Sequence, residues 1–322
     1  LISREEVINK INVFPVPDGD TGTNLALTLQ AVLATLRGNP DTHAGQTLTR
    51  VADAALDGAR GNSGAILAQF LLGLGDRAGH LAELTVEGFA DAVSGGASHA
   101  RESLAAPREG TILTVLTDFA AAVTREVRER GVRDFPALFR SALATARISL
   151  EATRGQLESL RRANVVDAGA LGFIELVAGM SGYLDTGVVP DDDAPIELIH
   201  DETSAAGQEE DLEYRYCTEC MITGDDIDRR KLREQASALG ASLVVAGTHR
   251  KVRLHLHLNE PQRLFELAAR FGEVSGEKAD DMQRQQEMAH HESRRKVAVV
   301  TDSAADLPDS VLEALDIHMV PV

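Results

Sequence analysis

The spacing of the apolar residues changes once along this 322-residue chain, and that change limits the folds it can adopt. From Leu1 to about Leu184 the apolar residues recur at the helical period; Leu25, Leu29 and Val32, for example, fall on one face. From about residue 211 they alternate with polar residues, as in a half-buried strand. The sequence therefore predicts a large helical domain followed by a smaller domain that contains a sheet.

In the first part of the chain, glycine, proline or asparagine interrupts the helical pattern at intervals. These interruptions predict an all-helical bundle whose loops gather at one end. One predicted helix starts near Asn24. The others are 65–74, 84–103, 111–130, 135–149 and 168–184.

The second part of the chain predicts the order strand, helix, strand, strand, helix, strand. The segment EYRYCTECMI alternates as a strand does, and DDIDRRKLREQASALG has the signals of a capped helix that ends in glycine. A hairpin with its turn near Gly247 follows, then a helix in EPQRLFELAARFG and a short strand. This order is that of a split βαβ, or ferredoxin-like, α+β domain, which we place at 211–275.

Charged segments separate the predicted domains. The helical domain covers 1–188, and the acidic segment 189–210 is interpreted as a linker because it lacks apolar periodicity. A second, charged linker covers 276–295. The last segment, 296–322, predicts strand, turn, helix and strand, the first βαβ unit of a truncated α/β domain. Because the chain begins at Leu1 and stops in a strand-like sequence, we expect a fragment cut at both ends.

The composition excludes several classes of protein. A formal net charge of −18 argues against a nucleic-acid-binding or anionic-membrane surface, but is compatible with an anionic ligand that arrives with metal ions. No apolar run approaches the ~20 residues of a transmembrane helix, so we expect no transmembrane segment and a cytoplasmic protein. Two cysteines are too few for a disulfide scaffold.

The segment NVFPVPDGDTGTN places two carboxylates, Asp18 and Asp20, just before a helix start. Pro15 and Pro17 hold the approach extended, and Gly19 gives the loop freedom to aim both carboxylates inward. Two hard ligands beside a helix N-terminus, which favours phosphates, suit Mg²⁺ bound with a phosphorylated substrate. The alternative interpretation is an acidic turn before a capped helix.

Further loops with glycine precede predicted helices. Thr21 or Thr23 is expected to cap the helix after the aspartates. The segment GARGNSGAILAQF is a second helix start whose amides and hydroxyl suit phosphates, although a tight interhelical turn explains it as well. REGTILTV at 108–115 and VVDAGALG at 165–172 are weaker signals of the same kind. Together the four loops predict one shared site at the open end of the bundle.

The predicted sheet carries a second cluster of chemically active residues. His255 and His257 are two apart on one strand and therefore share a face, and Cys217 lies on a strand expected to neighbour theirs. One cysteine and two histidines are a set that suits zinc. The alternatives are a solvated sheet face and a C-x-x-C pair of Cys217 with Cys220. The pair is disfavoured because residues three apart on a regular strand face opposite sides.

The motifs INVFPVPDGDTGTN, GARGNSGAILAQ, EGTILTV and VVDAGALGF follow one another in order, and over about residues 4–275 the chain resembles the large subunit of fatty acid kinase. The kinase domain of that family is related to the L-domain of dihydroxyacetone kinase. The resemblance implies a barrel of antiparallel helices with ATP and two Mg²⁺ at one end. The implied reaction transfers the γ-phosphoryl group of ATP to a fatty acid carboxylate and gives an acyl phosphate, mainly by positioning and charge neutralisation.

The resemblance also implies roles for individual residues. Asp18 and Asp20 would be the catalytic metal ligands. Dihydroxyacetone kinases use a third aspartate upstream, where this chain offers only Asn12, a neutral ligand. The implied phosphate-binding residues are Asn62, Ser63 and Gly64, and the other implied nucleotide-binding residues are Thr23, Asn24, Gly110, Thr111 and Asp167.

The resemblance extends to the middle domain and the C-terminal segment. The family's middle domain has a matching YCTE and HxH strand, associated with zinc bound by cysteine and histidine and with a homodimer. Residues 296–322, with VTDS and DLP, resemble the start of a DegV family fatty-acid-binding protein. This implies a fatty acid presented by that domain in cis or by a separate carrier in trans. Ser303 is expected to approach the fatty acid carboxylate.

Two other functions stay open at the level of sequence. The first is a dihydroxyacetone kinase-type phosphotransferase subunit; the missing third aspartate and the DegV-like segment speak against it. The second is a non-catalytic lipid-binding or regulatory protein with a relic nucleotide fold. The intact Asp18, Asp20 and GNSG motif speak against that interpretation.

Overall fold

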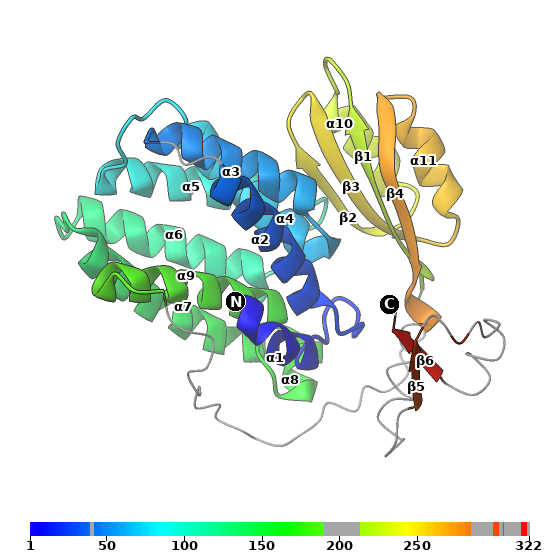
Figure 1. Cartoon of the computed structure of the whole chain (residues 1–322), viewed down its shortest axis with the longest axis horizontal. Helices are drawn as coiled ribbons and strands as arrows, with labels where there is room; N and C mark the ends of the chain where they lie inside the picture. The colour runs from blue at the N-terminus through cyan, green and yellow to red at the C-terminus, as the bar shows by residue number, and fades with distance from the viewer. Residues whose placement is uncertain (39–41, 190–212, 285–298, 303–304, 306–316, 321–322) are drawn as a thin grey trace. The chain divides into compact units, whose positions relative to one another are not determined.

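The computed structural model describes residues 1–38, 42–189, 213–284, 299–302, 305 and 317–320. These residues form two compact units, 1–282 and 283–322. The first unit contains both the helical domain and the α+β domain, which contact each other directly. Figure 1 shows the helices that precede the sheet in the chain on one side, and the sheet with its own two helices on the other.

The N-terminal part of the first unit is helical, as the apolar spacing predicts. Its N-terminal 3₁₀ helix is Ile2–Arg4. The α-helices are α1 (Glu5–Lys10), α2 (Thr21–Gly38), α3 (Ala44–Gly58), α4 (Gly61–Ala78), α5 (Val86–Glu102), α6 (Ile112–Arg128), α7 (Phe135–Gln156), α8 (Glu158–Ala163) and α9 (Ala168–Thr186).

The long helices pack in chain order around one core. Each helix from α2 to α7 contacts the next, and α9 contacts α7, α6 and α2, so the series closes on itself. Leucine, valine, isoleucine and alanine make up most of the core. At its centre Phe173 meets Phe70 and Phe119 edge to face, with ring centroids 5.5 Å apart in each pair. This packing fixes the loops at the helix ends, where the candidate site lies.

The α+β domain has the predicted element order. The elements are β1 (Tyr216–Thr223), α10 (Arg229–Ser237), β2 (Ala241–Gly247), β3 (Lys251–Leu258), α11 (Pro261–Ala268) and β4 (Glu273–Asp281). The strands form one antiparallel sheet in the order β2-β3-β1-β4. The two helices and one face of the sheet enclose a core that includes Ile222, Leu254 and Leu264.

The other face of this sheet turns toward the helical domain. Cys220 lies in the core beneath the helices, whereas Cys217 and Glu219 lie on the opposite face because side chains alternate along β1. Val244 and Ala246 of β2 pack against the helical domain. The interpretation of Cys217 and Cys220 as residues on opposite faces therefore agrees with the structure.

Strand β4 corrects one expectation from the sequence. The sequence predicts a charged linker from residue 276, but β4 continues to Asp281 and pairs with β1 as far as Tyr216. The segment is polar because this edge strand is largely exposed, and an exposed strand needs few apolar residues. Met282 is buried and closes the first unit.

In the second unit, β5 (Val299–Asp302) and β6 (Ile317–Val320) pair in parallel, with Val299 opposite Ile317. A parallel pair agrees with the strand–helix–strand order that we expect for a βαβ unit. The helix expected between the strands, Ser303 and nearly all of the predicted acidic linker lie outside the described residues. Among the described helices, none combines the length and the hydropathy that a membrane-crossing helix needs.

Candidate functional site

The two aspartates lie in a tight loop directly before α2. Gly19 between them adopts a left-handed backbone with a φ of 68°. The amide of Asn12 donates a hydrogen bond to Oδ1 of Asp18 over 2.5 Å. Burial, and then the neighbouring charge of Asp20, raise the pKa of Asp18 to about 8. Two carboxylates held this close therefore form a site that favours a cation. Helix α2 begins at Thr21, so Asp20 stands at its N-terminus.

The glycine-rich segment before α4 lies against this loop. Gly61 has a φ of 57°, and a Cβ atom added to it would lie 2.3 Å from Nδ2 of Asn24. The left-handed backbone therefore favours glycine here, and the contact shows how closely this residue approaches α2. The first amides of an α-helix have no partner within the helix, so the N-terminus of α4 offers donors at this point.

The loop that carries Asp18 and Asp20, here called the carboxylate loop, and the N-terminus of α4 line one small cavity together with residues of the sheet. Asp18 and Asp20 line it together with Ser63. The sheet contributes the three residues predicted to bind zinc. The other predicted residues that line this cavity are Asn12, Asn24, Asn62, Cys217, His255 and His257.

A larger cavity of about 520 Å³ adjoins the small one, because Asn62 and Ser63 line both. Thr111 and Asp167, each the N-cap of a helix, contribute side chains from the helical domain. Burial raises the pKa of Asp167 to about 6, although backbone amides that donate to it act in the opposite direction. The α+β domain closes the other side with Ser237 and residues 240–243.

Three residues of the implied nucleotide site do not line either cavity. The hydroxyl of Thr23 donates to Glu5 over 2.6 Å, which fixes α1 against α2. A Cβ on Gly64 would lie 2.5 Å from Oγ1 of Thr28, so this glycine lets α4 approach α2. Gly110 has a φ of 83° and packs against Gln156. The structure gives all three a role in packing.

Cys217, His255 and His257 come together as the alternation of the strands predicts. Cys217 lies opposite His257 in the pairing of β1 with β3. One ligand atom from each of the three residues can be chosen so that all lie within 4.8 Å of one another. Nε2 of His255 is buried and has no hydrogen-bond partner among the described residues. These donor atoms fit a zinc ion.

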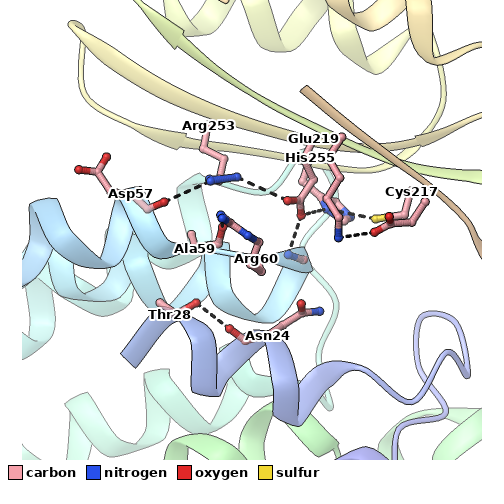
Figure 2. A network of polar contacts seen from close by, with 12 residues as sticks. Asn24, Thr28, Asp57, Ala59, Arg60, Cys217, Glu219, Arg253 and His255 are labelled. Carbon is pink, nitrogen blue, oxygen red and sulfur yellow. Dashed lines mark hydrogen bonds and ion pairs between the residues drawn. The ribbon is translucent and has the colours of Figure 1, made fainter. Parts of the chain in front are cut away.

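Sequence reasoning missed Glu219, the residue that connects the sheet to α4. Its buried carboxylate accepts hydrogen bonds from the amide of Gly61 over 2.6 Å and from Nδ1 of His255 over 3.0 Å (Figure 2). Burial would raise the pKa of Glu219, but the bond to His255, the charge of His255 and that of Arg253 lower it to about 2. Two signals in the sequence could have found it: Glu219 is the last residue of the YCTE motif, and it lies two residues after Cys217 and so shares its face.

Arg253 strengthens the same contact between the domains. Its guanidinium lies 3.5 Å from Oε2 of Glu219 and donates to the backbone oxygen of Asp57 over 3.3 Å (Figure 2). Lys251, two residues earlier on β3, forms an ion pair with the side chain of Asp57. The end of α3, the start of α4 and the sheet are thus joined by charged groups.

This environment shifts the pKa values of His255 and His257 in opposite directions. Burial lowers the pKa of His255, but the Cys217 sulfur and Glu219 outweigh burial and raise it to about 10. Burial and the neighbouring His255 lower the pKa of His257 to about 3. A metal-ligating histidine commonly donates its other ring N–H to a carboxylate, and Glu219 is placed to accept from His255 in that way.

Comparison with known families agrees with this two-domain organisation. Residues 15–182 match the DAK2 domain, and residues 213–289 match the FakA-like middle domain of fatty acid kinase. An uncharacterised protein of Staphylococcus saprophyticus is 30% identical over an alignment of 322 positions, gaps included. The alignment covers 97% of this chain and 58% of that protein. An uncharacterised protein of Staphylococcus aureus is 32% identical over 305 residues, 92% of this chain and 55% of that protein.

The chain spans only a little over half the length of these relatives, so their full activity is not shown by the comparison. The matched domains are those of kinases or kinase subunits, and both follow in the order that the sequence predicts. The DAK2 match alone covers more than half of the chain. The protein therefore belongs to the DAK2 domain family, with a middle domain of the FakA-like type.

Proposed function

We propose that this chain is the ATP-binding kinase part of a protein that phosphorylates the carboxylate of a carrier-bound fatty acid. One observation carries the proposal. The paired carboxylates Asp18 and Asp20 and the N-terminus of α4 at Ser63 face one cavity, which adjoins a cavity large enough for a nucleotide. A cation site beside an anion site is the arrangement that phosphoryl transfer requires.

The residues of the carboxylate loop fit Mg²⁺. Asp18 and Asp20 supply hard oxygen ligands on a partly exposed loop that lines the small cavity. Asn12 adds a carbonyl oxygen, Oδ1, that is buried and has no hydrogen-bond partner among the described residues. When bound, Mg²⁺ would neutralise the charge that develops on the phosphates. The side-chain amide of Asn12 donates to Asp18 and holds its carboxylate in place.

The nucleotide is proposed to occupy the larger cavity, with its phosphates toward Asn62 and Ser63, since these residues line both cavities. The amide of Gly61 is already used by Glu219, which leaves the next amides of α4 to meet a phosphate. Thr111 and Asp167 would contact the remainder of the nucleotide. The sheet would form the opposite wall of the site.

The acceptor, the carrier and the assembly rest on the family relation. The FakA-like middle domain supports a fatty acid acceptor presented by a DegV-like domain, in cis or in trans. The parallel pair β5–β6 is compatible with such a domain beginning at 296. A closed helical barrel, a ferredoxin-like middle domain, a homodimer and a cytoplasmic location belong to the same proposal.

Comparing acceptors tests the proposed reaction. ADP formation from MgATP is expected to rise with oleate or palmitate bound to a complete DegV-like carrier and to stay at its basal rate with dihydroxyacetone. A fatty acid is too apolar to be delivered free in water, so free oleate should stimulate far less than carrier-bound oleate. Stimulation by dihydroxyacetone alone would instead assign the chain to the dihydroxyacetone kinase type.

We further propose that Cys217, His255 and His257 bind one zinc ion. Elemental analysis of the purified protein is then expected to find about one zinc per chain, and Cys217→Ser is expected to remove most of it, because thiolate is the strongest of the three ligands. Cys220→Ser is the matched control, since Cys220 faces the core beneath the helices. A Cys217→Ser protein that keeps its full zinc content would contradict the assignment.

A further inference from the structure

A third cavity, of about 440 Å³, is polar and lies between α4 and α5 of the helical domain and α10 of the α+β domain. Among the acidic residues, only Glu102 is found in its described lining. The net charge of the chain is −18, so a cavity lined mainly by positively charged side chains differs from the chain as a whole. Four arginines line the cavity: Arg101, Arg229, Arg230 and Arg233. Such a concentration of positive charge favours an anionic ligand.

Gln69 of α4 gives an independent indication of a ligand. Its side chain lines the same cavity, although the residue is only 2% exposed. Its Nε2 atom is buried and has no hydrogen-bond partner in the part of the chain that the structure describes. A buried donor without an acceptor is costly, and native proteins rarely keep one. An acceptor oxygen brought into the cavity would satisfy this amide.

The arginines also have hydrogen-bonding capacity left. Arg229 donates to the backbone oxygen of Gly247 over 2.6 Å, and Arg101 donates to Glu109 over 2.8 Å. Each guanidinium has five N–H groups, so several are not used by these contacts. Nε of Arg233 is buried without a partner among the described residues. Burial and the charge of Arg229 lower the pKa of Arg233 and outweigh the opposing charge of Glu102, so a further anion beside Arg233 would relieve an unfavourable environment.

We propose that this cavity binds a small phosphorylated metabolite, with its phosphate held by the Gln69 amide and the guanidinium groups of Arg230 and Arg233. A phosphate monoester carries nearly two negative charges and three acceptor oxygens at neutral pH. Guanidinium groups match those oxygens two at a time, and the amide supplies a further donor. The volume lies within the range of small-molecule sites, so an organic group fits beside the phosphate.

This site is distinct from the proposed nucleotide site and does not depend on the kinase reaction. The two cavities share the single residue Leu104, and the phosphate-binding residues assigned to each are different. A ligand here would contact α4 and α10 at once. It would therefore stabilise the contact between the helical domain and the α+β domain.

Calorimetric titration with inorganic phosphate, without Mg²⁺ and at low ionic strength, tests the site. The wild-type protein is expected to bind phosphate with a Kd of about 1 mM or tighter, which corresponds to a modest but measurable affinity. Gln69→Leu is expected to weaken phosphate binding at least fivefold, and the Arg230→Gln/Arg233→Gln double variant at least tenfold. Arg263→Gln, on the exposed side of α11, is the control for positive charge lost away from the cavity.

Three results would overturn the proposal. The first is absence of phosphate binding to the wild-type protein, and the second is equal affinity in the Arg230→Gln/Arg233→Gln and Arg263→Gln proteins. The third is loss of phosphate binding in Ser63→Ala, which would move the ligand to the nucleotide site. Arg230 is exposed and Arg233 is half-buried on α10, so the double substitution is expected to leave the fold intact, which a circular dichroism spectrum checks, and it keeps the test decisive if Gln69→Leu unfolds. Binding of a polyglutamate peptide but not of phosphate would assign the cavity to an acidic protein segment.

Discussion

The Asp18→Asn/Asp20→Asn double variant is expected to bind ATP in the presence of Mg²⁺ at least a hundredfold more weakly than the wild-type protein, a loss of about 2.7 kcal/mol. Asparagine keeps the size of each side chain but removes the negative charge that makes the loop a ligand for Mg²⁺. The effect is large because the substitution removes both of the charged ligands that the loop offers to Mg²⁺. Calorimetric titration with MgATP gives the affinity.

The same titration without Mg²⁺ separates the metal from the fold. In that condition the double variant should bind ATP at least as well as the wild-type protein, because the negative charge of the aspartate pair, which repels the phosphates, is gone. Asp91→Asn is the matched control, since Asp91 is exposed on α5 and pairs with a surface residue, Arg128. Unchanged MgATP affinity in the double variant, with an unchanged circular dichroism spectrum, would exclude the carboxylate loop as the metal site.

Glu219→Gln is expected to lower the free energy of unfolding by about 3 kcal/mol, the usual order of magnitude when one partner of a buried ion pair is removed. The substitution leaves the Arg253 guanidinium without its charged partner inside the interface. It also places an amide where Gly61 and His255 now donate to a carboxylate. Chemical denaturation measured by circular dichroism gives the change in stability.

Glu219→Gln is also expected to weaken zinc binding by ten- to a hundredfold, because a carboxylate that orients a ligating histidine raises metal affinity by about that factor. A zinc-competition titration with a coloured chelator measures this second effect. Glu266→Gln, an exposed carboxylate on α11 of the same domain, is the control. If the two variants match in both stability and zinc affinity, Glu219 does not connect the metal residues to α4.

Local sequence patterns predict the secondary structure of this chain well. The helix around residues 111–130 and the strand that carries Cys217 follow directly from apolar spacing. Edge strand β4 is longer than its sequence pattern predicts, because its residues are polar and exposed and so carry no alternating apolar signal. Helix α3 (Ala44–Gly58) is not distinguished as a separate helix by its pattern, since its buried face consists largely of alanine and glycine.

The candidate site can be predicted from sequence only within each domain. Asp18 with Asp20, and His255 with His257, are close in sequence, so spacing alone pairs them. The meeting of these two groups around one cavity depends on how the sheet packs on the helices, which no local pattern encodes. The role of Glu219 could not be predicted for the same reason, because its partner Gly61 lies 158 residues away in the sequence.

The central claim, phosphorylation of a fatty acid carboxylate at the Asp18–Asp20 site, is tested most directly by trapping the product with hydroxylamine. This chain, MgATP and a complete DegV-like carrier loaded with oleate are incubated together, and the acyl hydroxamate is quantified. We predict that hydroxamate forms with ADP in equal amounts, and that neither forms above background with the Asp18→Asn/Asp20→Asn variant. Consumption of ATP without any acyl hydroxamate, or equal hydroxamate from the variant, would contradict the claim.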